Sequence, residues 1–147
     1  MTSKNISRIV ELKTMVKEQM SVEMMHAKEK LAWETAKLDG LKLELAGNME
    51  AMDQMQSLEA VDTDKLELLG NYMIYLDKRM KEQEKKIAGI QKEVDAKQSE
   101  LRNAYREERV FEILRSKMSM EEQRERQALE QKEMDFNAIK TRKTQGR

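Results

Sequence analysis

Apolar residues recur at heptad spacing along two long stretches of the chain. The first stretch has one row, Met24, Leu31, Leu38, Leu45 and Met52, and a companion row offset by three positions, Ala27, Leu41 and Met55. Rows spaced in this way fall on one side of a helix and predict a coiled coil. Upstream, Ile9, Leu12, Val16 and Met20 extend the apolar face with one extra four-residue step, which predicts a stutter that locally unwinds the supercoil.

The second stretch is longer. Its first row is Leu66, Met73, Met80, Ile87, Val94 and Leu101, and its second row is Leu69, Leu76, Ile90, Ala104, Phe111 and Met118. A few positions of the two stretches carry polar residues instead: Glu34, Asn48, Gln83, Lys97 and Glu108. The pattern predicts an all-α protein made of two long helices, at about residues 4–57 and 64–142.

The segment between the two stretches, "QSLEAVDTDKLEL", predicts a turn at about residues 58–63. Asp62 or Thr63 is suited to accept a hydrogen bond from the first free N–H groups of the second helix. A chain folded back near residue 61 brings Leu45 to Leu76, Leu31 to Ile90, Met20 to Leu101 and Ile9 to Phe111. We therefore expect an antiparallel coiled-coil hairpin within one chain, forming a single elongated domain over residues 1–147.

In this register the first helix ends opposite Met118, which is also where the apolar rows stop. In a parallel dimer, the second helix would pair with its own copy along its whole length, and the rows would have no reason to stop at Met118. We therefore expect a monomer. Residues 119–147, here named the overhang, then extend beyond the paired region and end in a basic tail at 143–147. Because an isolated helix is only marginally stable in water, the overhang is either partly disordered alone or completed by a partner.

Composition limits the function classes. The chain of 147 residues is 38% charged and 4% aromatic, has no proline or cysteine, and carries 28 basic and 28 acidic side chains. A zero net charge gives no global attraction for nucleic acid or an anionic membrane. Lack of cysteine excludes disulfides and thiolate chemistry. With no apolar run for a signal or a membrane span, we expect a cytoplasmic protein without direct membrane insertion.

No catalytic constellation is visible. The single histidine, His26, occupies an outward heptad position, and the carboxylates are scattered rather than gathered in a pocket. There is no glycine-rich phosphate loop and no metal-ligand cluster. We expect no enzyme activity, no cofactor and no metal.

Apolar residues outside the predicted seam, the row positions where the helices meet, are candidate contacts for partners. Leu68, Tyr72 and Tyr75 form a short outward row on the second helix, and Trp33 and Leu43 belong to a comparable outward row on the first. Such side chains either lie over the seam with polar tips in water or dock a protein. For the Trp33 row, the alternative is a single tolerated surface aromatic.

Four segments in order resemble the FliJ family of the bacterial flagellar type III export apparatus. They are "ISRIVELKTMVKEQMSVEMMHAKEKL", "YMIYLDKRMKEQEKKI", "LRNAYREERVFEILRSK" and "QKEMDFNAIKTRK". Together they cover nearly the whole chain. The resemblance implies a stalk-like coupling protein of flagellar biogenesis, motility and chemotaxis. It implies binding to the hexameric export ATPase and the membrane export gate, and help in delivering chaperones and substrates at the cytoplasmic side of the inner membrane.

Carried onto this sequence, the gate-contacting positions of the family fall on Tyr72 and Leu76. Since Leu76 also lies on the predicted seam, Tyr72 and Tyr75 are the better candidates. The ATPase-facing positions implied by the resemblance are Ile6, Ile9, Val10, Phe111, Leu114, Leu129, Met134, Phe136 and Ile139. The Trp33 and Leu43 row matches no feature of the family and is a possible extra surface.

Other classes stay open at this point. The stalk proteins of virulence-type injectisomes share the architecture. The chain also fits a generic coiled-coil scaffold or dimerisation module, and an escort for secreted subunits that uses its methionine-rich seam as an adaptable surface.

Overall fold

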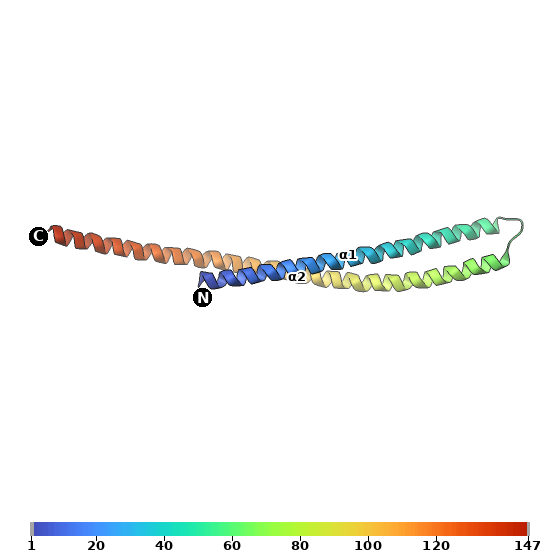
Figure 1. Cartoon of the computed structure of the whole chain (residues 1–147), viewed down its shortest axis with the longest axis horizontal. Helices are drawn as coiled ribbons and strands as arrows, with labels where there is room; N and C mark the ends of the chain where they lie inside the picture. Colours follow the sequence, from blue (N-terminus) through green and yellow to red (C-terminus); the bar gives the residue numbers. More distant parts are fainter. Residues whose placement is uncertain (1, 147) are drawn as a thin grey trace. The chain divides into compact units, whose positions relative to one another are not determined.

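Two long helices account for nearly all of the chain in the computed structural model, which describes residues 2–146. Helix α1 spans Ser3–Gln56 and helix α2 spans Thr63–Gln145. There is no strand among the described residues. The fold is an all-α helical hairpin whose second helix is the longer one, as the heptad rows predict (Figure 1).

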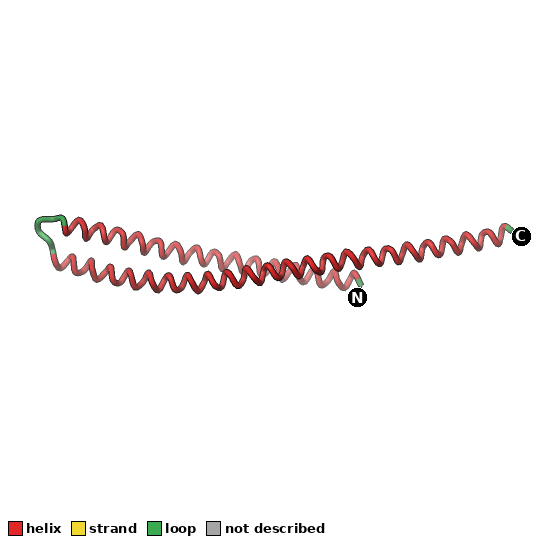
Figure 2. The backbone as a smooth tube through the Cα atoms, turned by 180° about the vertical axis from the view of Figure 1, so that it is seen from behind, coloured by secondary structure: helices red, strands yellow, loops and turns green. Residues whose placement is uncertain are grey.

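Asp62 sets the start of α2. Its Oδ1 accepts hydrogen bonds from the N–H groups of Asp64 at 3.1 Å and Lys65 at 3.3 Å, and its carbonyl accepts one from Leu66 at 3.1 Å. This is the bonding of an N-cap residue, which satisfies donors that the first helical turn cannot pair internally. Of the two capping residues suggested by the sequence, Asp62 is the one used, and the short turn before it appears in Figure 2.

Residues 20–100 form one compact unit, in which the two helices run antiparallel from the turn. Its buried apolar cluster consists of Met24, Ala27, Ile90 and Val94, with Leu31 packed against it. Leu31 and Ile90 thus belong to the same cluster, as the predicted antiparallel register requires. Burial of such side chains, at about 25 cal/mol per Å² of apolar area, is the main stabilising contribution to a hairpin of this kind.

Polar residues within this seam bond across it. Glu34 is only 5% exposed, and the Gln83 amide donates to its Oε2 at 2.6 Å and to its backbone carbonyl at 2.8 Å. The hydrogen bond from Gln83 is the main reason that the pKa of Glu34 lies below its usual value. Asn48 likewise donates to the Leu69 carbonyl at 3.0 Å. These bonds explain how polar residues can occupy seam positions.

The second compact unit consists of residues 1–19 with residues 101–147, which include the first turns of α1 and the C-terminal half of α2. Here the predicted apolar row is wrong: Leu12 is 61% exposed and Val16 is 45% exposed. Within the described part of residues 1–19, the buried residues of α1 are Ile6 and Val10 instead. The seam of α1 follows Ser3, Ile6, Val10, Lys13, Lys17 and Met20, which continues the heptad spacing of Met24 without a stutter.

The predicted stutter is wrong, because two of the seam positions in this part of α1 are lysines rather than apolar residues. Lys13 pairs with Glu107 at 2.8 Å, and Lys17 pairs with Glu108 at 2.9 Å. Their aliphatic stems lie along the seam while each ammonium group reaches a carboxylate of α2. A charged residue at a heptad position is thus compatible with the seam when the opposite helix supplies its counter-ion.

Pairing in this unit extends to Glu122. Its carboxylate accepts hydrogen bonds from the Ser3 backbone N–H at 2.9 Å and from the Ser3 hydroxyl at 2.5 Å. These bonds lower the pKa of Glu122, the side-chain bond being the larger cause. Glu122 thus caps the N-terminus of α1 from the other helix, where a negative charge also complements the helix dipole.

Beyond Glu122, every described side chain of α2 is exposed. The helix continues to Gln145, past the end predicted near residue 142, so most of the predicted basic tail is helical; Arg147 lies outside the described residues. The single-domain organisation stays a prediction.

Candidate partner-binding surfaces

Tyr72 and Tyr75 form an exposed aromatic pair on α2, within residues 20–100. Their rings stack with centroids 5.9 Å apart, and the two side chains are 43% and 50% exposed. The Tyr72 hydroxyl donates to Glu44 Oε2 on α1 at 3.0 Å, and this bond is the main cause of the raised pKa of Tyr72. Arg79 donates to the Tyr75 hydroxyl at 3.3 Å and lies 5.9 Å from the centre of its ring.

These contacts hold both rings in place while leaving much of their surface in water. Aromatic side chains with a polar tip and few rotatable bonds are common at the energetic centre of protein interfaces. Leu76, the third residue predicted for this surface, is 1% exposed and packs in the seam. In this chain it therefore offers almost no surface to a partner.

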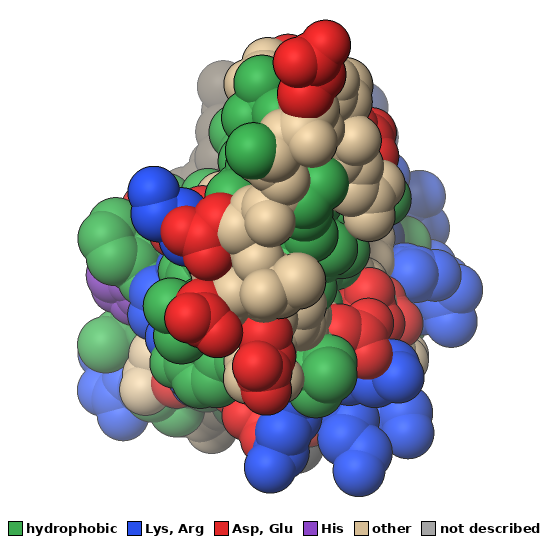
Figure 3. Space-filling view, turned by 90° about the vertical axis from the view of Figure 1, so that its right-hand side faces the viewer, with side chains coloured by type: hydrophobic (Ala, Val, Ile, Leu, Met, Phe, Trp, Pro, Cys, Tyr) green, Lys and Arg blue, Asp and Glu red, His purple; other side chains and the backbone are tan. Residues whose placement is uncertain are grey.

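Further apolar side chains near the tyrosines are exposed. Leu68 is 69% exposed and Ile74 is 70% exposed. Ile74 was missed by sequence reasoning, because it belongs to neither heptad row and follows no outward spacing with the tyrosines. Toward the turn, Leu58 and Val61 are also exposed, and Figure 3, seen from the turn end, shows hydrophobic and acidic side chains side by side there.

The positions predicted to face the ATPase fall into two groups by exposure. Ile6 is fully buried and Val10 is 5% exposed, whereas Ile9 and Phe111 are half-buried. The ammonium group of Lys13 lies 5.7 Å from the centre of the Phe111 ring. Leu114 is more open, at 38% exposed. Ile6 and Val10 therefore shape the paired chain ends, and the exposed members of the set are the ones able to touch another protein.

Lys17 and Glu108 form a largely buried ion pair between the N-terminal part of α1 and the C-terminal half of α2. The ammonium lies 3.0 Å from Glu108 Oε1 and 2.9 Å from Oε2, and 5.0 Å from the centre of the Tyr105 ring. The hydrogen bond between them raises the pKa of Lys17 and lowers the pKa of Glu108. Because each charge has its partner within the fold, this pair has a structural role and is not a candidate reactive site.

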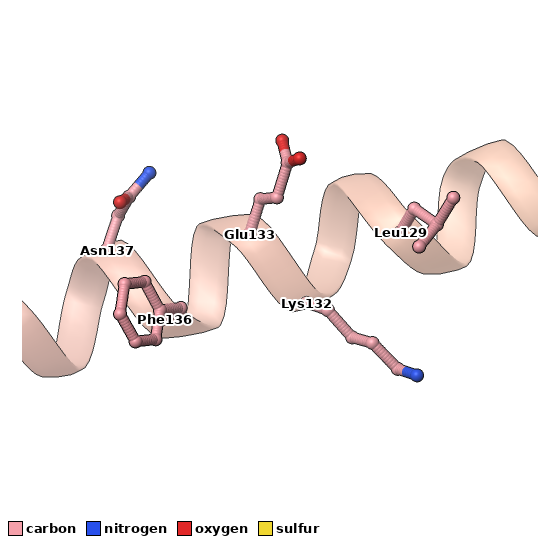
Figure 4. A pocket seen from close by; sticks show the side chains of 5 residues that line it. All are labelled: Leu129, Lys132, Glu133, Phe136 and Asn137. Atoms are coloured by element: carbon pink, nitrogen blue, oxygen red, sulfur yellow. The ribbon is translucent and has the colours of Figure 1, made fainter.

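The overhang presents its apolar residues directly to water. Leu129, Met134, Phe136 and Ile139 are between 58% and 66% exposed. Figure 4 shows Leu129 and Phe136 following one another along the helix, with Glu133 and Asn137 on one side and Lys132 on the other; these five residues line a shallow hollow. An amphipathic helix with exposed apolar anchors is a common element of protein recognition.

The extra surface predicted on α1 is also exposed. Trp33 and Leu43 are 66% and 75% exposed, and the Lys37 ammonium lies 5.7 Å from the Trp33 ring centre. A methyl group added at Gly40 or Gly47 would meet no atom within 4 Å, so the hairpin itself does not require either glycine.

The part of the chain that the structure describes contains neither a candidate metal site nor a candidate membrane span. Residues 2–146 hold no cluster of three or more histidine, cysteine, aspartate or glutamate side chains placed to bind a metal ion. No helix within this range combines the length and the apolar character needed to cross a membrane.

An antiparallel helical hairpin with heptad-spaced seam residues places the chain among the coiled-coil proteins. The family model described as Flagellar FliJ protein matches residues 3–145, so the chain belongs to the FliJ family. No curated protein matches the chain, and no solved structure does. The family is a non-catalytic component of the flagellar export apparatus, and membership implies a role for this chain in that apparatus.

Proposed function

We propose that this chain couples the export ATPase to the membrane export gate as a stalk-like protein and assists the delivery of chaperones and their substrates. The observation that carries the proposal is the family match over residues 3–145, combined with an overhang whose large apolar side chains are exposed among the described residues. The ATPase would bind at the chain ends, and the gate would bind at the tyrosine pair. The chain would work at the cytoplasmic side of the inner membrane.

The ATPase contact is assigned to the overhang together with the exposed edge of the neighbouring chain ends. Leu129, Phe136 and Ile139 supply apolar area, and a helix that lacks a buried face gains most from a partner that covers it. Ile6 and Val10 hold the two helices together beneath this surface. Ile9, Phe111 and Leu114 are the accessible residues at the same end.

ATP hydrolysis by the cognate export ATPase tests this assignment. Adding the full chain is expected to raise both hexamer formation and hydrolysis. A chain that lacks residues 123–147 keeps the Ser3–Glu122 contacts and should lose most of the stimulation. Full stimulation by the shortened chain would overturn the assignment of the overhang. Trp33→Ala serves as the control, because that side chain is equally exposed but lies outside the proposed ATPase surface.

The gate contact is assigned to Tyr72 and Tyr75. Their stacked rings are held by Glu44 and Arg79, so little conformational freedom is left to lose on binding. A Tyr72→Ala, Tyr75→Ala double variant should weaken gate binding about tenfold or more, as truncation of aromatic anchors commonly does. The helical circular-dichroism signal should be unchanged. Unaltered binding would show that the pair is only a surface feature of the hairpin.

A further inference from the structure

Charged side chains at seam positions are bonded across the seam almost everywhere. Among the described residues, seven seam positions carry a charge, and all seven are buried or half-buried. Six of them contact the other helix: Lys13, Lys17, Glu34, Lys97, Glu108 and Glu122. Glu34 lies 3.2 Å from Lys86 in addition to its bonds from Gln83, and Lys97 lies 3.7 Å from Glu23. A charge in this seam is thus normally matched by a side chain of the opposite helix.

Arg115 is the seventh charged seam residue and the exception. It follows Leu101 and Glu108 in the same row of α2 and is half-buried. No carboxylate of the described residues forms an ion pair with it. Because a guanidinium stays protonated in proteins, this position always holds a cation, and the described fold does not supply its counter-ion.

Arg115 lines a hollow at the paired chain ends. The other lining residues are Ser3 and Ser7 of α1 and Ser116, Ser119 and Met120 of α2. All of them belong to one compact unit. The hollow therefore places the forked N–H groups of a guanidinium beside serine hydroxyls, and both kinds of group donate hydrogen bonds to anionic oxygens.

The charges around the hollow favour an anion with a single negative charge. Residues 2–12 and 112–122 together hold four basic and four acidic side chains, so no surplus of positive charge attracts a phosphate group. Glu122, bonded to Ser3 at the hollow, would also repel a doubly charged ion. A carboxylate carries one charge and accepts two parallel hydrogen bonds from a guanidinium. Carboxylates are also the counter-ions of the three seam lysines.

We infer that Arg115 binds an aspartate or glutamate side chain of a partner protein at this hollow. The inference rests on the proposed function, because the lining residues are sequence neighbours of Ile6 and Leu114 in the ATPase-facing set, and it deepens that function by naming an ionic contact. The hairpin does not need this cation. Replacement of a charge in a packed seam by an apolar side chain is commonly neutral or stabilising, and residues that weaken a fold in this way are typical of binding sites.

Arg115→Leu in the full chain tests the inference with two measurements. The first is ATP hydrolysis by the cognate export ATPase over a series of chain concentrations. The concentration that gives half-maximal stimulation should rise about tenfold, because the partner's carboxylate loses its counter-ion. The second is thermal unfolding of the chain alone, whose midpoint should rise by about 2–4 °C, because an apolar residue packs better in the seam. Weaker binding together with a more stable hairpin identifies a residue that serves a partner.

Lys117→Leu is the matched control. It removes the same charge and adds the same apolar side chain at an exposed position of the same helix, so the half-maximal concentration should stay within about twofold of the original. A second variant, Arg115→Lys, keeps the charge but loses the planar fork and should fall between Arg115→Leu and the unaltered chain.

The outcomes separate this inference from the proposed function. If the unaltered chain stimulates hydrolysis and Arg115→Leu does so at the same concentrations, the ionic contact is refuted and the proposed function stands. If Arg115→Leu lowers the thermal midpoint, Arg115 stabilises the fold and the inference is overturned. If the unaltered chain gives no stimulation, the proposed function fails and the inference fails with it.

Inorganic phosphate distinguishes the expected carboxylate from the other common anion. At constant ionic strength, added phosphate should shift the thermal midpoints of the unaltered chain and of Arg115→Leu equally. A stabilisation that saturates with phosphate in the unaltered chain alone would show that the hollow binds free phosphate, and it would overturn the assignment to a protein carboxylate.

Discussion

The two parts of α2 share one heptad register but differ in what covers it. Between Leu66 and Met118 the seam positions are buried or half-buried against α1, whereas from Leu129 onward the same positions are open to water. The difference comes from the end of α1 at Ser3, where Glu122 caps it. A helix can therefore extend well beyond its intramolecular partner, and the described side chains of that part stay exposed.

Truncation of one apolar side chain in each part should give the largest contrast. Leu76 is 1% exposed and Phe136 is 66% exposed. Leu76→Ala should reduce the free energy of unfolding by about 2–4 kcal/mol, because a buried apolar group and its packing are lost. Phe136→Ala should change it by less than about 0.5 kcal/mol.

Urea unfolding followed by circular dichroism at dilute protein concentration measures both variants. Leu68→Ala is the control, because Leu68 lies on the paired part of α2 but is 69% exposed. Its truncation should change the free energy of unfolding as little as Phe136→Ala does. Comparable losses for Leu76→Ala and Phe136→Ala would mean that the overhang is packed against something in the isolated chain.

Acid should destabilise the paired part. The pKa values of Glu34, Glu108 and Glu122 are lowered in the folded chain, by hydrogen bonds from Gln83, Lys17 and Ser3 respectively. The unfolded chain consequently binds more protons in acid, so their stabilisation is present above about pH 4.5 and is lost as the pH falls through the folded values. Lys17 acts at the other extreme, since its raised pKa gives stabilisation that disappears only in strong base.

Glu108→Gln isolates one of these contributions. Without the titrating carboxylate, the fall in stability between neutral pH and about pH 3 should be shallower than in the unaltered chain. Thermal unfolding across that range measures it, with Glu130→Gln in the overhang as the matched control. If the stability of the Glu108→Gln variant falls as steeply with acid, the Lys17–Glu108 pair does not contribute to the acid dependence.

A local effect, smaller than these, is expected at the cap of α1. Glu122→Ala removes the acceptor for the Ser3 N–H and hydroxyl, so the first turn of α1 should fray. Faster amide exchange over residues 3–6 would report this, with little change in the overall unfolding midpoint. Glu125→Ala, one turn further along the exposed helix, should leave those amides as they are.

Much of the fold was predictable because the apolar residues of the seam recur at heptad spacing. The rows around Leu31 and Ile90 indicated both helices and their antiparallel register, and the polar interruption at Glu34 did not obscure them. The chain ends were predicted less well. There the seam contains Lys13 and Lys17, whose fit depends on Glu107 and Glu108 across the seam, and a pairwise contact of that kind cannot be recognised from one helix alone.

The candidate surfaces were predictable only in part. Exposure of Tyr72 and Trp33 follows from their outward positions, and that of Phe136 from its place beyond the paired region, but the contact that holds Tyr72 depends on both helices. Ile74 gave no periodic signal at all. The assignment of Ile6 to a partner stays a prediction, although its complete burial argues for a packing role.

Amide hydrogen exchange along α2 at dilute protein concentration tests the central claim most directly. Strong protection should extend from the turn to about Glu122, and exchange should then be fast from Gln123 to Gln145, because no intramolecular partner covers that segment. Protection that continues unchanged through Phe136 and Ile139 in the monomer would contradict the claim that the pairing ends at Glu122.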